Sequence, residues 1–174
     1  YKGSLIERWN CAFELGRIHH NHEKSGLDVF EKYYQLAKQI DPSRPESDFM
    51  MGIYYFEINE WNKAFSYFKV AFDIGIPGPS FFKPTMYYFY IPHYVLRLAL
   101  HFRDSLYAIR ASQLLEQHKS IIQEWRLEKH LYVPIYLFPQ LHVILNQWLV
   151  PIYRPNLCKK PIVCFIVPFG WTSW

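Results

Sequence analysis

Apolar side chains recur every three or four residues in the N-terminal part of the chain, and short polar stretches interrupt them. This spacing places the apolar side chains on one face of a helix. It predicts two helices within Leu5–Ile40, separated by the polar residues Asn21–Gly26. Two more are predicted within Glu46–Ile74, separated by a turn at Asn59–Trp61. Asp41-Pro42 is expected to end the second helix, because proline cannot continue a helix.

The same pattern occurs twice at one period. Small and aromatic residues of the second predicted helix recur 34 residues later in the fourth. A helix–turn–helix unit of this period is typical of the tetratricopeptide repeat. One such unit cannot bury its apolar face alone, so we expect an all-α, right-handed stack of antiparallel helix pairs over residues 5–117. The matching residues are Phe30, Tyr34 and Ala37, followed by Ala64, Phe68 and Ala71.

A third helix pair is expected at Tyr87–Leu100 and Ser105–His118, after an interruption at Gly75–Pro84 that is rich in proline and glycine. Its first helix has no glycine at the crossing point, and Pro92 would kink or start that helix. We therefore interpret this pair as a degenerate repeat. The alignment that we expect matches Ala108 and Ala111 with Phe68 and Ala71, 40 residues earlier, which implies six inserted residues.

The composition changes after Glu128, because no Asp or Glu follows it. Leu131–Tyr153 is long enough to span a membrane, but its prolines and amide side chains favour an irregular or partly helical buried segment. Ile162–Val167 is a continuous apolar run of the kind found in buried strands, and it predicts the first strand of an α/β domain. A frame-shifted or mistranslated tail is the alternative. We therefore expect a repeat domain at 1–118, a connecting segment at 119–160 and a strand within 161–174.

Composition and charge exclude several classes of function. Apolar residues make up 51% of the chain, which is sufficient for a substantial core. The net charge of +4 comes without a run of Lys or Arg, so nucleic-acid binding is not expected. The three cysteines form no CxxC pair, which indicates buried free thiols in a reducing compartment such as the cytoplasm.

No motif predicts catalysis, a cofactor or a metal. His19 and His22 are three residues apart on a predicted helix, but no third ligand has matching spacing, so we expect packing instead. The acidic residues of the repeats are better explained as solvated helix faces and caps than as catalytic pairs. They are Glu7, Glu14, Asp41 and Glu46.

Three segments resemble a known family. Arg8–Gly16 reads RWNCAFELG, Ile40–Glu46 reads IDPSRPE, and the spacing of Ala99–Leu115 is also similar. They resemble the tetratricopeptide region that accompanies glycosyltransferase domains in some bacterial and large-virus proteins. The resemblance covers residues 5–117 and implies that Ile162–Val167 would open a sugar-nucleotide-binding domain. None of that domain's catalytic residues has a match in this chain.

The first helix of each pair should line the groove of the stack. Counting from Gly16 and Gly52 gives a set of exposed positions with arginine, asparagine and aromatic side chains, which suits a peptide segment or a fused catalytic domain. We therefore expect a non-catalytic scaffold for protein–protein or interdomain contact; the alternative is the N-terminal part of a glycosyltransferase. The groove positions are Asn10, Phe13, Arg17, His20 and Asn21, then Phe49, Ile53, Phe56 and Glu57.

Overall fold

The computed structural model describes residues 3–21, 26–77, 83–131, 141 and 143, and all regular structure within them is helical. This confirms the all-α expectation. The predicted strand Ile162–Val167 and nearly all of Leu131–Tyr153 lie outside the described residues. The elements are α1 Leu5–Asn21, α2 Leu27–Ile40, α3 Glu46–Glu57, α4 Trp61–Ile74, η1 Met86–Tyr90 (a π-helix), α5 Ile91–Phe102, α6 Ser105–Gln117, α7 Lys119–Glu124 and η2 Glu128–His130 (a 3-10 helix).

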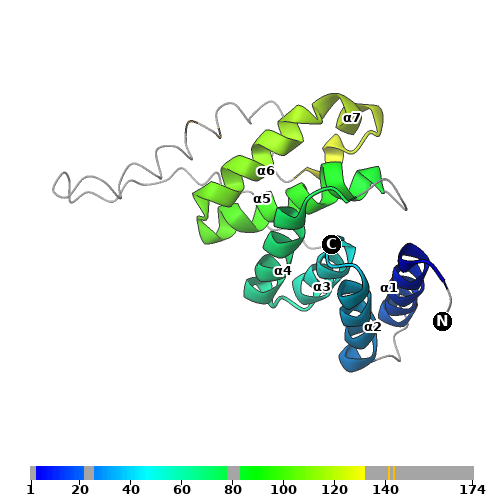
Figure 1. Cartoon of the computed structure of the whole chain (residues 1–174). Coiled ribbons are helices and arrows are strands. Elements are labelled where there is room, and N and C mark those ends of the chain that lie inside the picture. Colours follow the sequence, from blue (N-terminus) through cyan, green and yellow to red (C-terminus); the bar gives the residue numbers. More distant parts are fainter. Residues whose placement is uncertain (1–2, 22–25, 78–82, 132–140, 142, 144–174) are drawn as a thin grey trace.

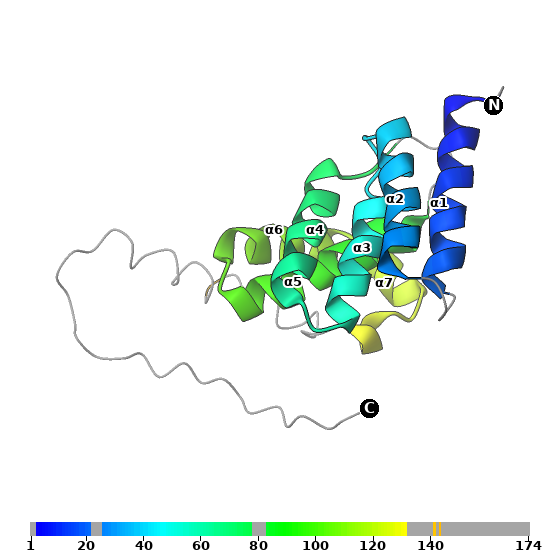
Figure 2. The same ribbon diagram turned by 90° about the horizontal axis from the view of Figure 1, so that it is seen from below.

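Neighbouring helices pack as pairs, α1 with α2, α3 with α4 and α5 with α6, and the pairs follow one another along a stack (Figures 1 and 2). α1 lies at one edge of the molecule in both views, and in Figure 1 α5, α6 and α7 lie together at the other end of the stack. None of the helices in the described part of the chain is both long and apolar enough to cross a membrane. The architecture is therefore a helical stack of the kind that repeat proteins form.

Two glycines allow the helices of the first two pairs to cross closely. A Cβ atom on Gly16 would lie 2.7 Å from the Tyr34 ring, and a Cβ atom on Gly52 would lie 2.5 Å from the Phe68 ring. Real Cβ atoms do not approach that closely, so each glycine leaves the space that the aromatic ring of the second helix fills. The two crossings are thus equivalent, with first helices 36 residues apart and second helices 34 apart.

The third pair is in a different register from the one that the sequence predicted. Asn59 after α3 and Arg103 after α5 both have left-handed backbone conformations, with φ of 63° and 56°. The residue after each donates its amide proton to a carbonyl five residues back, Glu60 to Tyr55 and Asp104 to Ala99. These turns match at an offset of 44 residues rather than 40, so the insertion is ten residues rather than six.

In the corrected register, the large and small side chains at the third crossing have changed places between the two helices. With the offset of 44, Leu96 takes the place of Gly52, and Ser112 takes the place of Phe68. Both are buried, and the Ser112 hydroxyl donates to the Ile109 carbonyl of its own helix at 2.9 Å. At the crossings of the first two pairs, a glycine of the first helix therefore meets an aromatic ring of the second. At the third crossing, the larger residue is on the first helix and the smaller one is on the second. Pro92 lies at the start of α5, as one of the two expectations for it required.

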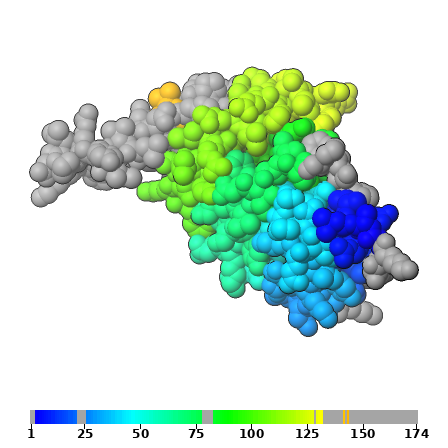
Figure 3. All heavy atoms as spheres, viewed as in Figure 1, coloured from blue at the N-terminus to red at the C-terminus, as the bar shows by residue number. Residues whose placement is uncertain are grey.

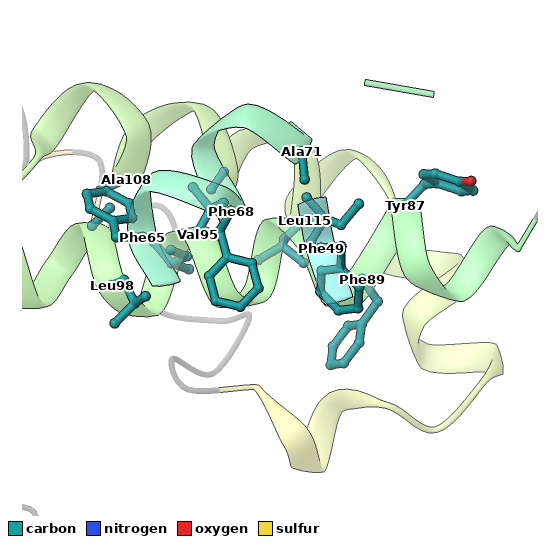
Figure 4. Packing of buried hydrophobic residues seen from close by; sticks show 14 of the residues in the cluster. Phe49, Phe65, Phe68, Ala71, Tyr87, Phe89, Val95, Leu98, Ala108 and Leu115 are labelled. Atoms are coloured by element: carbon teal, nitrogen blue, oxygen red, sulfur yellow. The ribbon is translucent and has the colours of Figure 1, made fainter. Parts of the chain in front are cut away.

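The core extends through the joins between pairs. Phe49, Phe68 and Val95 converge from α3, α4 and α5 (Figure 4). Ile122 of α7 belongs to the same cluster and is fully buried. A second cluster joins α1 and α2 to Met51 of α3. The divisions of the chain at 118 and 160 stay predictions.

Candidate binding face on the first helices

The predicted groove residues lie on α1 and α3, which are neighbours in one layer of the stack. The His20 ring of α1 lies 5.9 Å from the Tyr54 ring of α3, and the Phe56 ring of α3 lies 5.2 Å from the Tyr94 ring of α5. α1, α3 and α5 therefore form one continuous surface, which we call the first-helix face. It brings together residues that are more than 70 positions apart in the sequence.

Two of the predicted groove positions are not exposed. Phe13 is 1% exposed and Phe49 is 6% exposed, so the expectation that they line an open groove was wrong. The Lys83 ammonium lies 5.4 Å from the centre of the Phe13 ring and 3.9 Å from a Glu14 carboxylate oxygen. The Tyr94 ring lies 6.0 Å from the Phe49 ring. Later parts of the chain thus cover both phenylalanines, and the 34-residue period contains no information about that cover.

A buried ion pair lies beneath the same part of the face. The Arg44 guanidinium donates to Glu46 Oε1 at 2.7 Å and lies over the Trp9 ring, 3.8 Å from its centre. The Tyr87 hydroxyl also donates to Glu46 Oε1, and burial followed by this hydrogen bond raises the pKa of Tyr87. Glu46 is 1% exposed, so the expectation of a solvated carboxylate was wrong for this residue. Its position in the structure is at the join between α1, α3 and η1.

Two other acidic residues cap local structure as expected. Glu7 accepts the Ser4 amide proton at 2.8 Å, and Asp41 accepts the Ser43 amide proton at 3.1 Å. The backbone and hydroxyl hydrogen bonds from Ser4 lower the pKa of Glu7. These carboxylates therefore stabilise helix and turn ends.

The open part of the face is formed by partly accessible side chains of α1, α3 and α5. Phe56 is half-buried, with the Tyr94 ring against its edge and the Arg97 guanidinium 4.8 Å from its ring centre. Arg97 was absent from the sequence prediction, although the offset of 44 places it at the position of Ile53. The predicted residues that remain at least partly accessible are Asn10, Arg17, His20, Asn21, Ile53, Phe56 and Glu57.

His20 packs against aromatic side chains of α2 at this open part of the face. Its ring stacks on Phe30 with 4.7 Å between ring centres, and its Nδ1 is 3.2 Å from the Tyr34 hydroxyl. Burial lowers the pKa of His20, and the negative charge of Glu57 opposes that shift in part. The lowered pKa favours the neutral form of the His20 imidazole at pH 7.

Of the two histidines considered as metal ligands, His19 and His22, the first packs against an aromatic ring. His19 stacks on Tyr33 with 5.3 Å between ring centres, which agrees with the packing role expected for it. His22 lies outside the described residues. No group of three or more His, Cys, Asp or Glu side chains is arranged to hold a metal ion in the part of the chain that the structure describes.

The burial of His93 should make the stability of the fold sensitive to acid. It is 8% exposed, and burial, then Arg97 and His130, lower its pKa to about 4 from an ordinary 6.5. Between these values the unfolded chain binds a proton that the folded chain excludes, so stability falls as the pH falls from 6.5 towards 4. We expect a loss of about 2 kcal/mol from this residue between pH 7 and pH 5, measured by urea unfolding.

His93→Phe is the matched variant, because Phe13 and Phe49 occupy the aligned positions in the other two pairs. It should remove most of the loss between pH 7 and pH 5, with a smaller remainder from His20 and His118, whose pKa values are also lowered. An equal loss in the variant and the wild type would contradict the assignment to His93.

No model of a known protein family matches this sequence, and neither a curated protein nor a solved structure shows detectable similarity to it. The description of the helical stack and of the first-helix face therefore rests on the residues of this chain and their geometry.

Proposed function

We propose that this chain is a non-catalytic scaffold of the tetratricopeptide class, and that the open part of its first-helix face binds a protein segment. The glycine–aromatic crossing at Gly16 and Tyr34, repeated at Gly52 and Phe68, supports the assignment to this class. The 34-residue spacing of the second helices supports it as well. The concave surfaces of such stacks serve for recognition, and seven of the predicted groove residues remain at least partly accessible on the first helices.

The chemistry of the open part indicates the kind of segment that fits. Ile53 and Phe56 provide half-buried apolar surface, and Arg97 lies against Phe56 at its edge. An aliphatic or aromatic side chain would pack on the apolar pair, and an acidic neighbour would meet Arg97. The proposed ligand is therefore an extended peptide with an apolar anchor beside a carboxylate. The observation that most supports it is the Phe56–Arg97 contact between two different helix pairs.

A displayed library of random 12-residue peptides tests this proposal. We expect wild-type protein to enrich peptides with an apolar–acidic pair, and we expect Phe56→Glu and Arg97→Glu to lose those peptides. Leu106→Glu is the matched control, because Leu106 is an exposed leucine on α6, in the other layer of helices. Enriched peptides that bind the Phe56→Glu variant as well as the wild type would contradict the proposal, and so would the absence of enrichment.

The glycosyltransferase alternative rests on the resemblance of Arg8–Gly16 and Ile40–Glu46. These two runs meet in the structure, where Trp9 of the first contacts Arg44 of the second. The contact gives both runs a packing role, and the alternative stays a prediction about the parent protein. Turnover of a sugar nucleotide by purified residues 1–174 would contradict the non-catalytic proposal.

A further inference from the structure

Three apolar positions follow one side of α1, and each has an aligned partner in α3 and in α5. The offsets of 36 and 44 residues, taken from the glycine crossings and the left-handed turns, define the alignment. The aligned sets are Cys11, Ser47 and Ile91; Leu15, Met51 and Val95; and Ile18, Tyr54 and Leu98.

In α3 and α5 this stripe is covered by the second helix of the preceding pair. Met51 is 1% exposed and lies in one cluster with Tyr34 and Ala37 of α2. Val95 is fully buried in one cluster with residues of α4, including Phe68. The aligned positions are thus buried or half-buried in α3 and α5, where α2 packs on α3 and α4 packs on α5.

In α1 the same stripe faces outward. Leu15 is 42% exposed, Ile18 is 46% exposed, and Cys11 is also exposed, which corrects the expectation of a buried thiol. α1 is at the edge of the molecule in all three whole-chain views (Figures 1, 2 and 3). A terminal unit of a stack needs a polar outer face to remain without a neighbour, whereas this one exposes three apolar side chains over about two turns of α1, beyond the polar Glu7 and Arg8.

We propose that the stripe of Cys11, Leu15 and Ile18, called here the α1 stripe, binds the second helix of a further helix pair. The occupant should resemble α2 and α4, because those helices cover the aligned positions of α3 and α5. We favour this occupant because the α1 stripe is aligned with the positions that a second helix covers at the two described joins. The α1 stripe is separate from the first-helix face, so the two proposals are independent.

A chimera with one additional pair tests the proposal. A copy of residues 46–83, which contains α3, α4 and the following connection, is placed directly before Ser4 of the chain. Pro84 and Ser4 are aligned, so the added α4 should meet α1 as the native α4 meets α5. With Cys158→Ser and Cys164→Ser in both proteins, Cys11 is the only thiol. Its rate of labelling by a maleimide then reports whether the stripe is covered.

The rate at which the maleimide labels the chimera should be about one tenth of the rate for the unfused chain, or lower. Leu15→Glu with Ile18→Glu should restore fast labelling, whereas Leu106→Glu should leave it slow. An unchanged rate in a chimera that is folded by circular dichroism would overturn the proposal. If the chimera does not fold, a synthetic peptide of residues 61–77 is added to the unfused chain at about 1 mM, and unchanged labelling then overturns it. Slow labelling of the unfused chain that accompanies dimer formation would also overturn it, because a second copy would be the occupant.

Discussion

Arg44→Met is expected to lower the free energy of unfolding by about 3–5 kcal/mol, because it leaves the Glu46 carboxylate buried without its cationic partner. Both side chains of the pair are at most 2% exposed, so water cannot replace the lost guanidinium. The variant also removes the contact between Arg44 and the Trp9 ring. Urea unfolding followed by circular dichroism measures the change.

Two further variants make this prediction specific to burial. Arg17→Met removes a cation that lies 2.7 Å from Glu14, but the two side chains are 45% and 32% exposed, so this pair should contribute less than about 1 kcal/mol. Arg44→Met combined with Glu46→Gln should recover part of the loss, because the amide carries no charge to desolvate. If Arg44→Met and Arg17→Met lower the stability equally, the pair is not buried as the structure has it.

Gly52→Leu is expected to destabilise the second helix pair by about 1–3 kcal/mol or more, because the added side chain meets the Phe68 ring. A Cβ atom alone would lie 2.5 Å from that ring, and Phe68 is fully buried among core residues. The shift in the urea midpoint measures the effect. Val70→Leu is the control, because Val70 is an exposed residue of α4 and should tolerate the larger side chain.

A second substitution should reverse part of that loss. Gly52→Leu with Phe68→Ser copies the combination of Leu96 and Ser112 at the aligned positions of the third pair. The serine hydroxyl would donate to a carbonyl of its own helix, as Ser112 does to Ile109, while the leucine fills the space of the ring. The double variant should therefore be more stable than Gly52→Leu alone. A double variant that is less stable would show that the register of 44 residues is misassigned.

The local pattern of the chain was sufficient to place the first four helices. α2 and α4 begin and end 34 residues apart, as the repeated aromatic and alanine positions predicted. The sequence also marked Gly16 and Gly52 as crossing positions on the first helices, but the structure identified Tyr34 and Phe68 as the rings that meet them. Such features follow from which side chains share a helix face, and that is a property of sequence spacing alone.

Contacts between distant segments decided the rest. Part of the cover over Phe13 comes from Lys83, and the second partner of Glu46 is Tyr87. Both residues follow an insertion whose path no period predicts. The left-handed turn after α5 defines the register that aligns Arg97 with Ile53, and the sequence pattern did not predict this register. Cys11 is exposed because no described helix precedes α1, although its aligned partners are buried. Sequence spacing determined which residues face a neighbour, and the tertiary structure alone decided which neighbour, if any, each face meets.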